Sequence, residues 1–427
     1  MRHLFDQYTQ PENRLTHALV SSLANDPALL KRFVHWATGQ KPPTSKLSIV
    51  EQTLPGQEEP LCEDQDRRRG LPDGWIYDED NWCLLIENKI QSALTRSQLD
   101  RHRATALRRG FEKIVLLALV PNPSNEAALY GDSVFLKKWT DVYLWMSQQS
   151  QSEWAARLTS YMQVLEQKLV FDCYLREGTL TVFDGIKFEK NNPYSYIEAK
   201  RLLRLALDEL RNRSDLRDQL GMDGKGQGRP AITGRDTTRV WNFLRLKQAK
   251  GVKNFTEFPH LTLGVHDDLL LAIVTVPNGI KREFRKHLLA GGRDQFTALF
   301  RQLHLNLNSA VTGINGAVPW VEILQRRYPS QRSEPIIDAT LRFDLRTAFT
   351  SSGKIKHQQQ WLDATYEALS KRHSNLQLAV GAIFPFDRCP EVRKPEVLNH
   401  VANVWIACKP LIDTLIGTPK ASAAAGH

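Results

Sequence analysis

The sequence is poor in cysteine and lacks any long hydrophobic run. Five cysteines occur among 427 residues, with no CxxC pair and no Cys/His spacing typical of a zinc site. We therefore expect reduced thiols in a cytoplasm, with neither a disulfide framework nor structural zinc. The best apolar run, LLLAIVTV at 269–276, has strand length, short of the roughly 18 residues that span a bilayer. No apolar signal core occurs near Met1, so we expect a cytoplasmic protein without a membrane partner.

Two motifs of common enzyme classes are also absent. The glycine-rich basic stretch GKGQGRPAITGRDTTR at 224–239 matches neither GxxxxGK[ST] nor GxGxxG, which argues against a nucleotide-binding P-loop. No serine stands in a nucleophile-elbow setting, which argues against a serine hydrolase of that kind.

Acidic residues are outnumbered by basic ones. The chain has 57 Lys and Arg against 47 Asp and Glu, a formal net charge of +10, which is consistent with a polyanionic partner. Its 41% hydrophobic and 24% charged residues are typical of a globular protein. The length predicts two domains, which we place at 1–170 and 171–420.

The first domain alternates helices and strands. Pro11 and the spacing of Leu15, Leu19 and Leu23 predict a first helix over 11–37. The next predicted elements are strands at 46–54, 75–77 and 82–89, a helix at 92–110, strands at 113–123 and 134–139, a helix capped by Thr140 and a helix at 152–169. The strands at 75–77 and 82–89 form a hairpin around DEDN. This order predicts an α/β domain with a mixed sheet.

The second half reads as a separate α+β domain with a helical lead-in. A strand-rich connector at 176–189 precedes a helix at 196–213, for which Ser195 and Glu198 form a capping box. Further predicted elements are a hairpin at 261–276, strands at 335–345 and 376–385, and helices at 279–289, 294–306, 356–372 and 396–416.

The second strand of the DEDN hairpin ends in charged residues. The apolar WCLLI is followed by Glu87 and Lys89. These two charges must be solvated, neutralised by a partner or required for a function. Side chains alternate along a strand, so Glu87 and Lys89 share one face while Asn88 points the other way. Because the hairpin turns at 78–81, Asp73 returns level with this pair. Two carboxylates and one ammonium therefore converge at the open end of the hairpin.

This set of groups suits metal-assisted phosphodiester hydrolysis. Mg²⁺ binds through one or two carboxylates, keeps several waters and contacts substrate phosphate, so Asp73 and Glu87 are candidate ligands, with Mn²⁺ as an alternative ion. The Lys89 ammonium can orient or help deprotonate the attacking water. The alternative interpretation is a solvated ion pair that contributes little to stability. Under the catalytic interpretation, we expect Glu87→Ala and Lys89→Ala to abolish cleavage and leave the melting temperature nearly unchanged.

The pattern resembles the PD-(D/E)XK nuclease superfamily, which has the restriction-endonuclease-like fold of a mixed sheet flanked by helices. The matching residues are Pro72 and Asp73 for PD, and Glu87, Asn88 and Lys89 for ExK. The resemblance covers about residues 10–145. It implies that Asp73 and Glu87 hold the metal, that the backbone carbonyl of Asn88 is a further ligand, and that Lys89 serves the attacking water.

Two more residues fit this resemblance. Glu12 in PENRLTHAL stands where such nucleases often carry a glutamate on the first helix, and Gln98 in SALTRSQLDRH stands where many carry a glutamine after the ExK strand. On the helix Glu12 lies along the apolar stripe, where a carboxylate is costly unless it is paired. The alternative for Glu12 is a favourable interaction with the positive end of the helix dipole.

Candidate nucleic-acid contacts lie elsewhere in the chain. Arg101 and His102 follow Gln98 and could touch phosphate, although the sequence favours a solvated face for this part of the helix. From residue 200 to residue 253 there are 14 Lys or Arg and six Asp or Glu. Arg229, Arg235 and Arg239 in this segment are candidates for backbone contacts, with a solvated basic surface as the alternative.

Together these features predict a Mg²⁺-dependent endonuclease. We expect its substrate to be DNA, with RNA as the alternative that the sequence leaves open. The first domain would cut, and the second would recognise a substrate, partner or signal. A role in bacterial anti-phage or restriction-type defence follows by analogy, and a protein partner or a homo-oligomer is left open. The alternative is a catalytically silent nuclease-fold module that binds nucleic acid or protein within a defence or repair complex.

Overall fold

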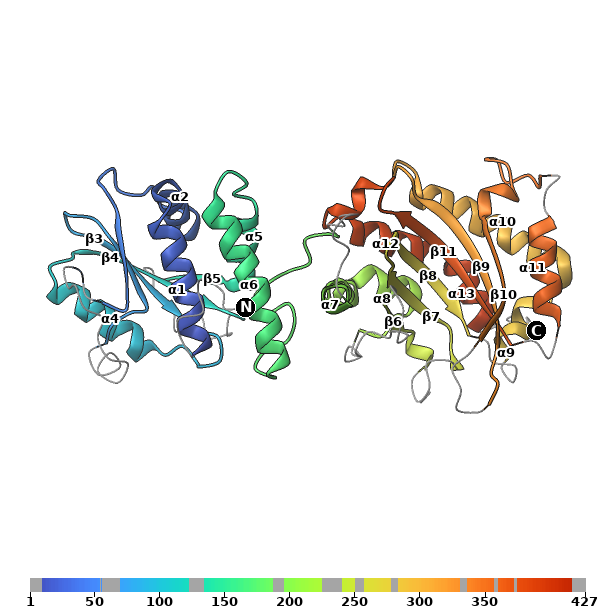
Figure 1. The fold of residues 1–427 in the computed structure, drawn as a ribbon, viewed down its shortest axis with the longest axis horizontal. Helices are drawn as coiled ribbons and strands as arrows, with labels where there is room; N and C mark the ends of the chain where they lie inside the picture. The colour runs from blue at the N-terminus through green and yellow to red at the C-terminus, as the bar shows by residue number, and fades with distance from the viewer. Residues whose placement is uncertain are drawn as a thin grey trace, which may run out of the picture. The chain divides into compact units, whose positions relative to one another are not determined.

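The computed structural model describes residues 10–53, 55, 70–122, 134–186, 196–224, 240–249, 257–277, 283–330, 336–356, 360–371 and 375–416. The chain divides into two compact units between Val182 and Phe183 (Figure 1). Both units combine helices with a β-sheet, so the fold is mixed α/β with two sheets.

The first unit contains a five-stranded mixed sheet. Its strands, in both chain and sheet order, are β1 (Ser48–Glu51), β2 (Gly74–Tyr77), β3 (Trp82–Asn88), β4 (Lys113–Val120) and β5 (Val134–Lys138). Neighbours from β1 to β3 pair antiparallel, whereas β3, β4 and β5 run parallel. The DEDN hairpin is therefore confirmed as β2 and β3, with Tyr77 opposite Cys83 and Gly74 opposite Ile86.

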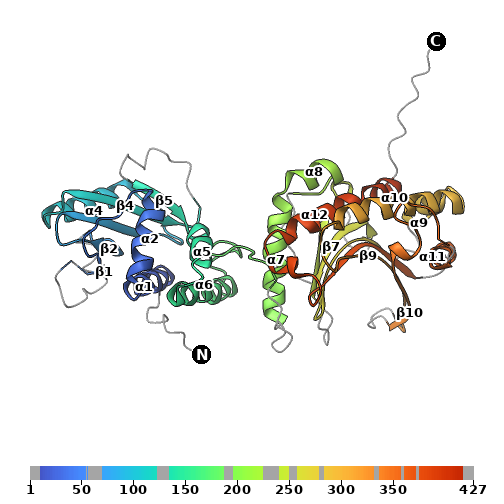
Figure 2. The same ribbon diagram turned by 90° about the horizontal axis from the view of Figure 1, so that it is seen from above.

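Helices cover both faces of this sheet, as Figure 2 shows. One face carries the helices α1 (Pro11–Ala24), α2 (Pro27–Thr38), α5 (Trp139–Ser147) and α6 (Glu153–Phe171), and the other carries α4 (Arg96–Arg108). Leu84 and Ile86 of β3 are buried in the first core, and Cys83 and Leu85 join Leu99 of α4 in the second. Because side chains alternate along a strand, Glu87 and Lys89 lie on the same face of the sheet as Cys83, Leu85 and α4.

The single helix expected over 11–37 is wrong, because the chain forms two helices there. α1 ends at Ala24, and the side chain of Asp26 accepts a hydrogen bond from the backbone N–H of Leu29. Pro27 occupies the first turn of α2, where its missing N–H has no helical partner to lose. An Asp followed by Pro is a helix-start signal that the leucine spacing alone concealed.

The cap expected at Thr140 is also wrong. α5 already begins at Trp139, and Lys138 occupies the cap position. Here the Asp141 carboxylate accepts a hydrogen bond from the backbone N–H of Lys138, so the acidic residue performs the capping.

The boundary between the units lies later than the expected position near residue 170. Glu166 of α6 is fully buried, and its carboxylate accepts hydrogen bonds from Gly178, Leu180 and Thr181. Those bonds fasten the segment after α6 to the first unit. The strand-rich connector predicted at 176–189 is wrong for residues 176–186, which contain no strand, and residues 187–189 lie outside the described part of the chain.

The second unit contains a six-stranded antiparallel sheet. Its strands in sheet order are β10 (Ile336–Asp344), β9 (Val318–Arg327), β11 (Leu376–Pro385), β8 (Leu269–Val276), β7 (His260–Val265) and β6 (Val240–Arg245). Its described helices are α7 (Tyr196–Asn212), α8 (Ser214–Leu220), α9 (Glu283–Leu289), α10 (Gly292–Val311), α11 (Gln360–Ser370), α12 (Val397–Ala407) and α13 (Lys409–Ile416). Figure 2 shows α8, α12 and α10 along one side of the curved sheet. Val380, Phe300 and Trp405 meet in the core between these layers.

The hairpin and the two later strands predicted for this unit are confirmed, whereas β6 and β9 were missed. Pro319 lies near the start of β9, where it pairs with Ala382 of β11 and where the pairing with β10 has already ended at Trp320. The predicted helix at 396–416 is divided at Cys408. No helix in the described ranges combines the length and the apolar character that crossing a membrane requires.

Candidate functional site

A pocket of about 600 Å³ opens where β3 ends and β2 begins. Antiparallel pairing brings these two strand ends to the same edge of the sheet, so residues that are distant in sequence share the pocket. Its charged and amide-bearing lining residues are Gln10, Glu12, Asn13, Gln52, Asp73, Glu87, Lys89, Gln98, Arg101 and His102. The structure therefore brings together Glu12, Asp73, Glu87, Lys89 and Gln98, the five residues selected from the sequence.

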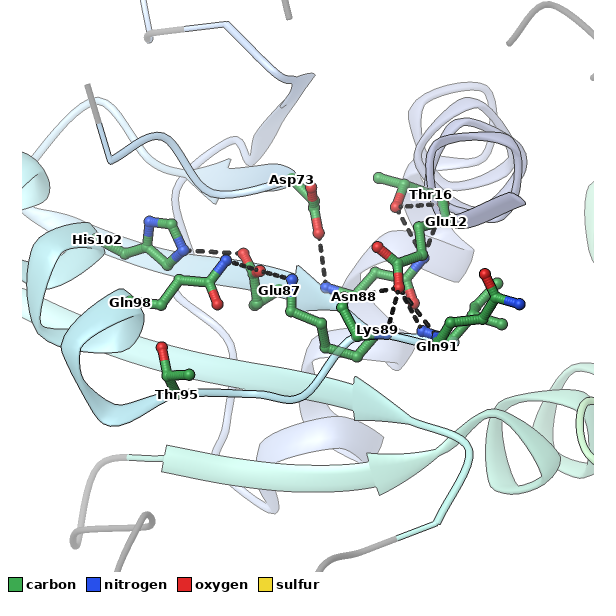
Figure 3. A network of polar contacts seen from close by, with 12 residues as sticks. Glu12, Thr16, Asp73, Glu87, Asn88, Lys89, Gln91, Thr95, Gln98 and His102 are labelled. Carbon is green, nitrogen blue, oxygen red and sulfur yellow. Dashed lines mark hydrogen bonds and ion pairs between the residues drawn. The ribbon is translucent and has the colours of Figure 1, made fainter. Parts of the chain in front are cut away.

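Both carboxylate oxygens of Glu87 are in contact with neighbouring side chains. Oε1 accepts hydrogen bonds from the Lys89 ammonium at 2.6 Å and from the Gln98 amide at 2.7 Å (Figure 3). Oε2 lies 2.8 Å from Nε2 of His102. Only 3% of Glu87 is exposed, so these contacts are made by a nearly buried carboxylate. A carboxylate with both oxygens engaged has a defined orientation.

Asp73 lies beside the end of β3. Its Oδ2 accepts a hydrogen bond of 2.7 Å from the backbone N–H of Asn88, as Figure 3 shows. Burial, followed by the nearby Glu87 carboxylate, raises the pKa of Asp73 well above its ordinary value. Two carboxylates that repel one another in this way form a site that a cation would stabilise.

Lys89 remains a cation in this environment. Burial acts against its charge, but the hydrogen bond and charge of Glu87, together with the charges of Asp73 and Glu12, raise the pKa of the Lys89 ammonium. Its backbone N–H donates to Leu119, which extends the pairing of β3 with β4 by one residue and fixes the position of the side chain. The protonated ammonium can donate to a water or a phosphate oxygen but cannot accept a proton.

Glu12 reaches the pocket from the N-terminus of α1. Its Oε1 accepts hydrogen bonds from the backbone N–H groups of Ile90, Gln91 and Ser92 and from the Ser92 hydroxyl (Figure 3). Burial opposes ionisation, but these hydrogen bonds together lower the pKa of Glu12. Glu12 thus lines the same pocket as Asp73, and the structure shows it holding the loop that follows β3.

The side chain of Asn88 has a role that the sequence did not reveal. It is fully buried on the opposite face of β3 and donates to the backbone carbonyl of Glu12 and the hydroxyl of Thr16. Its Oδ1 accepts a hydrogen bond of 2.7 Å from the Trp139 indole N–H. Asn88 therefore ties β3 to α1 and α5. A polar residue on the core-facing side of an apolar strand was the signal that could have found it.

The predicted nucleic-acid contacts Arg101 and His102 differ in their exposure. Arg101 is exposed and lines the pocket, so it is available to a phosphate. His102 is buried, so the expected solvated face is wrong for it, and both ring nitrogens are engaged inside the protein, so the predicted phosphate contact is not available in this structure. Arg229, Arg235 and Arg239 lie outside the described residues.

The donor set fits a hard divalent cation. In the described ranges, no group of three or more His, Cys, Asp and Glu side chains is arranged to hold a metal ion. Mg²⁺ and Mn²⁺ need only one or two carboxylates from the protein, because waters and substrate oxygens occupy the remaining coordination positions. Asp73 and Glu87 supply such a pair. Burial, followed by the nearby Glu87 carboxylate, raises the pKa of Asp73, and a cation between the two groups would offset both effects.

Comparison with known proteins does not name a family, since no family model matches the chain and no curated protein is found as a relative.

Proposed function

We propose that the first unit is a nuclease that hydrolyses phosphodiester bonds with Mg²⁺, or with Mn²⁺ in its place. The proposal includes the restriction-endonuclease-like fold that its sequence pattern resembles. The single observation that carries the proposal is the convergence of Asp73, Glu87, Lys89 and Gln98 at one pocket on the strand ends.

Each residue has a defined role in this proposal. Asp73, Glu87 and the backbone carbonyl of Asn88 would hold the ion, which polarises the phosphate and lowers the pKa of a bound water. The charged Lys89 donates hydrogen bonds to the attacking water or to the phosphate, offsetting the charge that develops there. Gln98 orients the Glu87 carboxylate.

The proposed substrate is DNA, cut internally. The net charge of +10 favours a polyanion, and Arg101 at the pocket margin can contact a phosphate next to the cleaved bond. The second unit would recognise a substrate, partner or signal. By analogy, a cutting unit joined to a recognition unit suits bacterial defence against foreign DNA.

A cleavage assay with paired variants tests the proposal. The purified full chain is incubated with plasmid, linear duplex, single-stranded DNA and RNA, with Mg²⁺, Mn²⁺ or EDTA. We expect metal-dependent cleavage that Glu87→Gln abolishes. Glu112→Gln makes the same chemical change at the other end of the sheet, where Glu112 contacts the hairpin turn, and should cleave like the parent. Equal cleavage by the two variants would point to a contaminating nuclease.

Metal binding separates the enzyme from a silent module. Calorimetric titration with Mn²⁺ should show one binding event in the parent and none in Glu87→Gln. A chain that binds nucleic acid but neither binds metal nor cleaves would exclude the catalytic proposal and leave the binding module.

A further inference from the structure

His102 of α4 contacts both segments that carry the candidate metal ligands. It lies four residues after Gln98, and therefore on the same face of the helix. Nε2 of the ring is 2.8 Å from Oε2 of Glu87, and Nδ1 is 2.7 Å from the backbone carbonyl of Gly70. Only 2% of His102 is exposed, so these two contacts take place away from solvent.

The Gly70 carbonyl can only accept a hydrogen bond, so Nδ1 of His102 donates to it. Nε2 on the opposite side of the ring lies within hydrogen-bond distance of the Glu87 carboxylate. The ring is thereby locked in one orientation between Gly70 and Glu87.

The two contacts join separate parts of the chain. Gly70 precedes Asp73 by three residues and begins the segment that delivers Asp73 to the pocket, whereas Glu87 ends β3. Gly70 has a φ of +68°, and a Cβ there would lie 3.1 Å from Cβ of Arg101, so this segment approaches α4 as closely as glycine allows. The contact of His102 with both segments therefore depends on glycine at position 70 as well as on the imidazole.

The two carboxylate oxygens of Glu87 contact different side chains. Oε2 contacts His102, whereas Oε1 contacts both Lys89 and Gln98. With Oε2 in contact with His102, rotation of the carboxylate is restricted and Oε1 stays in contact with Lys89 and Gln98. Such partners of a ligand commonly change metal affinity by about 10- to 100-fold.

We propose that His102 is a positioning residue, which sets the orientation of Glu87 and its placement relative to Asp73 for divalent-metal binding. The inference rests on the proposed metal-dependent function. It assigns His102 no contact with substrate or with the reacting atoms. Its effect should therefore appear in metal affinity, and in activity only at limiting metal.

Mn²⁺ titration of the full chain, followed by the loss of the free-ion electron paramagnetic resonance signal, tests this role. We expect His102→Phe, which keeps a ring but no donor, to bind Mn²⁺ about 10- to 100-fold more weakly than the parent. His102→Gln restores one donor and should recover part of that loss. Arg109→Gln, an exposed change at the end of the same helix, is the matched control and should bind like the parent.

A second variant, at Gly70, tests the same role if His102→Phe does not fold. Gly70→Ala leaves His102 and Glu87 intact but strains the segment before Asp73, and it should weaken Mn²⁺ binding in the same direction. Melting temperatures in EDTA identify any variant that is simply unfolded. Parent-like affinity in folded His102→Gln and Gly70→Ala would overturn the positioning role while leaving the nuclease proposal intact. An absence of Mn²⁺ binding by the parent would instead overturn the nuclease proposal, and the positioning role with it.

Discussion

The ammonium of Lys89 lies 2.6 Å from Oε1 of Glu87, and this ion pair is nearly buried, with 11% of the Lys89 side chain and 3% of the Glu87 side chain exposed. The contact follows from strand geometry, since residues two apart share a face. The burial of this pair also increases the loss of stability expected when either charge is removed. A solvated pair at a strand end contributes little, whereas a buried charge deprived of its partner is costly.

We therefore expect unequal stability losses from the two halves of the pair. Glu87→Ala leaves the Lys89 ammonium without its anion and removes the Nε2 contact of His102, so it should lower the free energy of unfolding by about 3 kcal/mol or more at neutral pH. Lys89→Ala should cost less, because Glu87 keeps its contacts with His102 and Gln98. Urea unfolding measures both losses. The buried pair thus revises the expectation from the sequence that Glu87→Ala and Lys89→Ala would melt like the parent. Equally small losses in the two variants would support that earlier expectation.

Asn88 should matter to stability independently of catalysis. Asn88→Ala leaves the buried Trp139 indole N–H without its acceptor and removes one of the donors to the Glu12 carbonyl, so we expect a loss of about 2–4 kcal/mol in the free energy of unfolding. Gln91→Ala, an exposed change in the next loop, should stay within about 0.5 kcal/mol of the parent. A small loss for Asn88→Ala in urea unfolding would mean that water replaces these contacts.

The candidate site was predictable from the sequence to the extent that strand periodicity and hairpin pairing could be read. Alternation placed Glu87 and Lys89 on one face, and the DEDN turn returned Asp73 to their level. The buried environment could not be read in this way. Whether His102 faces solvent or Glu87 depends on how α4 packs on the sheet, and the amphipathic signal of that arginine-rich helix is weak.

Elements of the second unit were harder to predict for a related reason. Strands β7, β8 and β11 are apolar runs whose signal is local, and they were found. β6 and β9 carry polar residues or a proline, and their strand character comes from pairing with neighbours distant in sequence. The boundary at Val182 likewise depends on Glu166 binding a segment that has no regular structure of its own.

Glu12 should stabilise the loop after β3. Its Oε1 accepts three backbone N–H groups, and the ionised form makes the stronger hydrogen bonds. We expect Glu12→Gln to lose about 1 kcal/mol of stability and to raise amide hydrogen exchange at Ile90, Gln91 and Ser92. Unchanged exchange at these three amides, with a loss of metal binding, would instead assign Glu12 to the ion.

His260 predicts a pH dependence in the second unit. Burial, reinforced by the charge of Arg245, lowers the pKa of His260 to about 4, although a hydrogen bond to the Phe258 carbonyl acts against the shift. The unfolded chain takes up this proton near pH 6.5 and the folded chain does not, so stability falls as the pH drops from about 6.5 to about 4. The full loss would be about 3 kcal/mol.

The variant His260→Gln should remove that part of the pH dependence. Comparing urea unfolding of the parent and of His260→Gln at pH 7 and at pH 4.5 isolates the effect of this histidine from other titrating groups. His35→Gln, at an exposed position, is the control and should follow the parent at both pH values. A parent whose stability relative to His260→Gln is the same at both pH values would show that His260 titrates normally in the folded protein.

The central claim is that Asp73 and Glu87 jointly hold the divalent cation on which hydrolysis depends. Diffraction from crystals grown with Mn²⁺, recorded on both sides of the manganese absorption edge, locates that ion directly. The account predicts an anomalous peak between the two carboxylates, within coordination distance of both, and no peak there in crystals of Glu87→Gln. A parent crystal with no peak in this pocket, from protein that cleaves DNA with Mn²⁺ in the same solution, would contradict it.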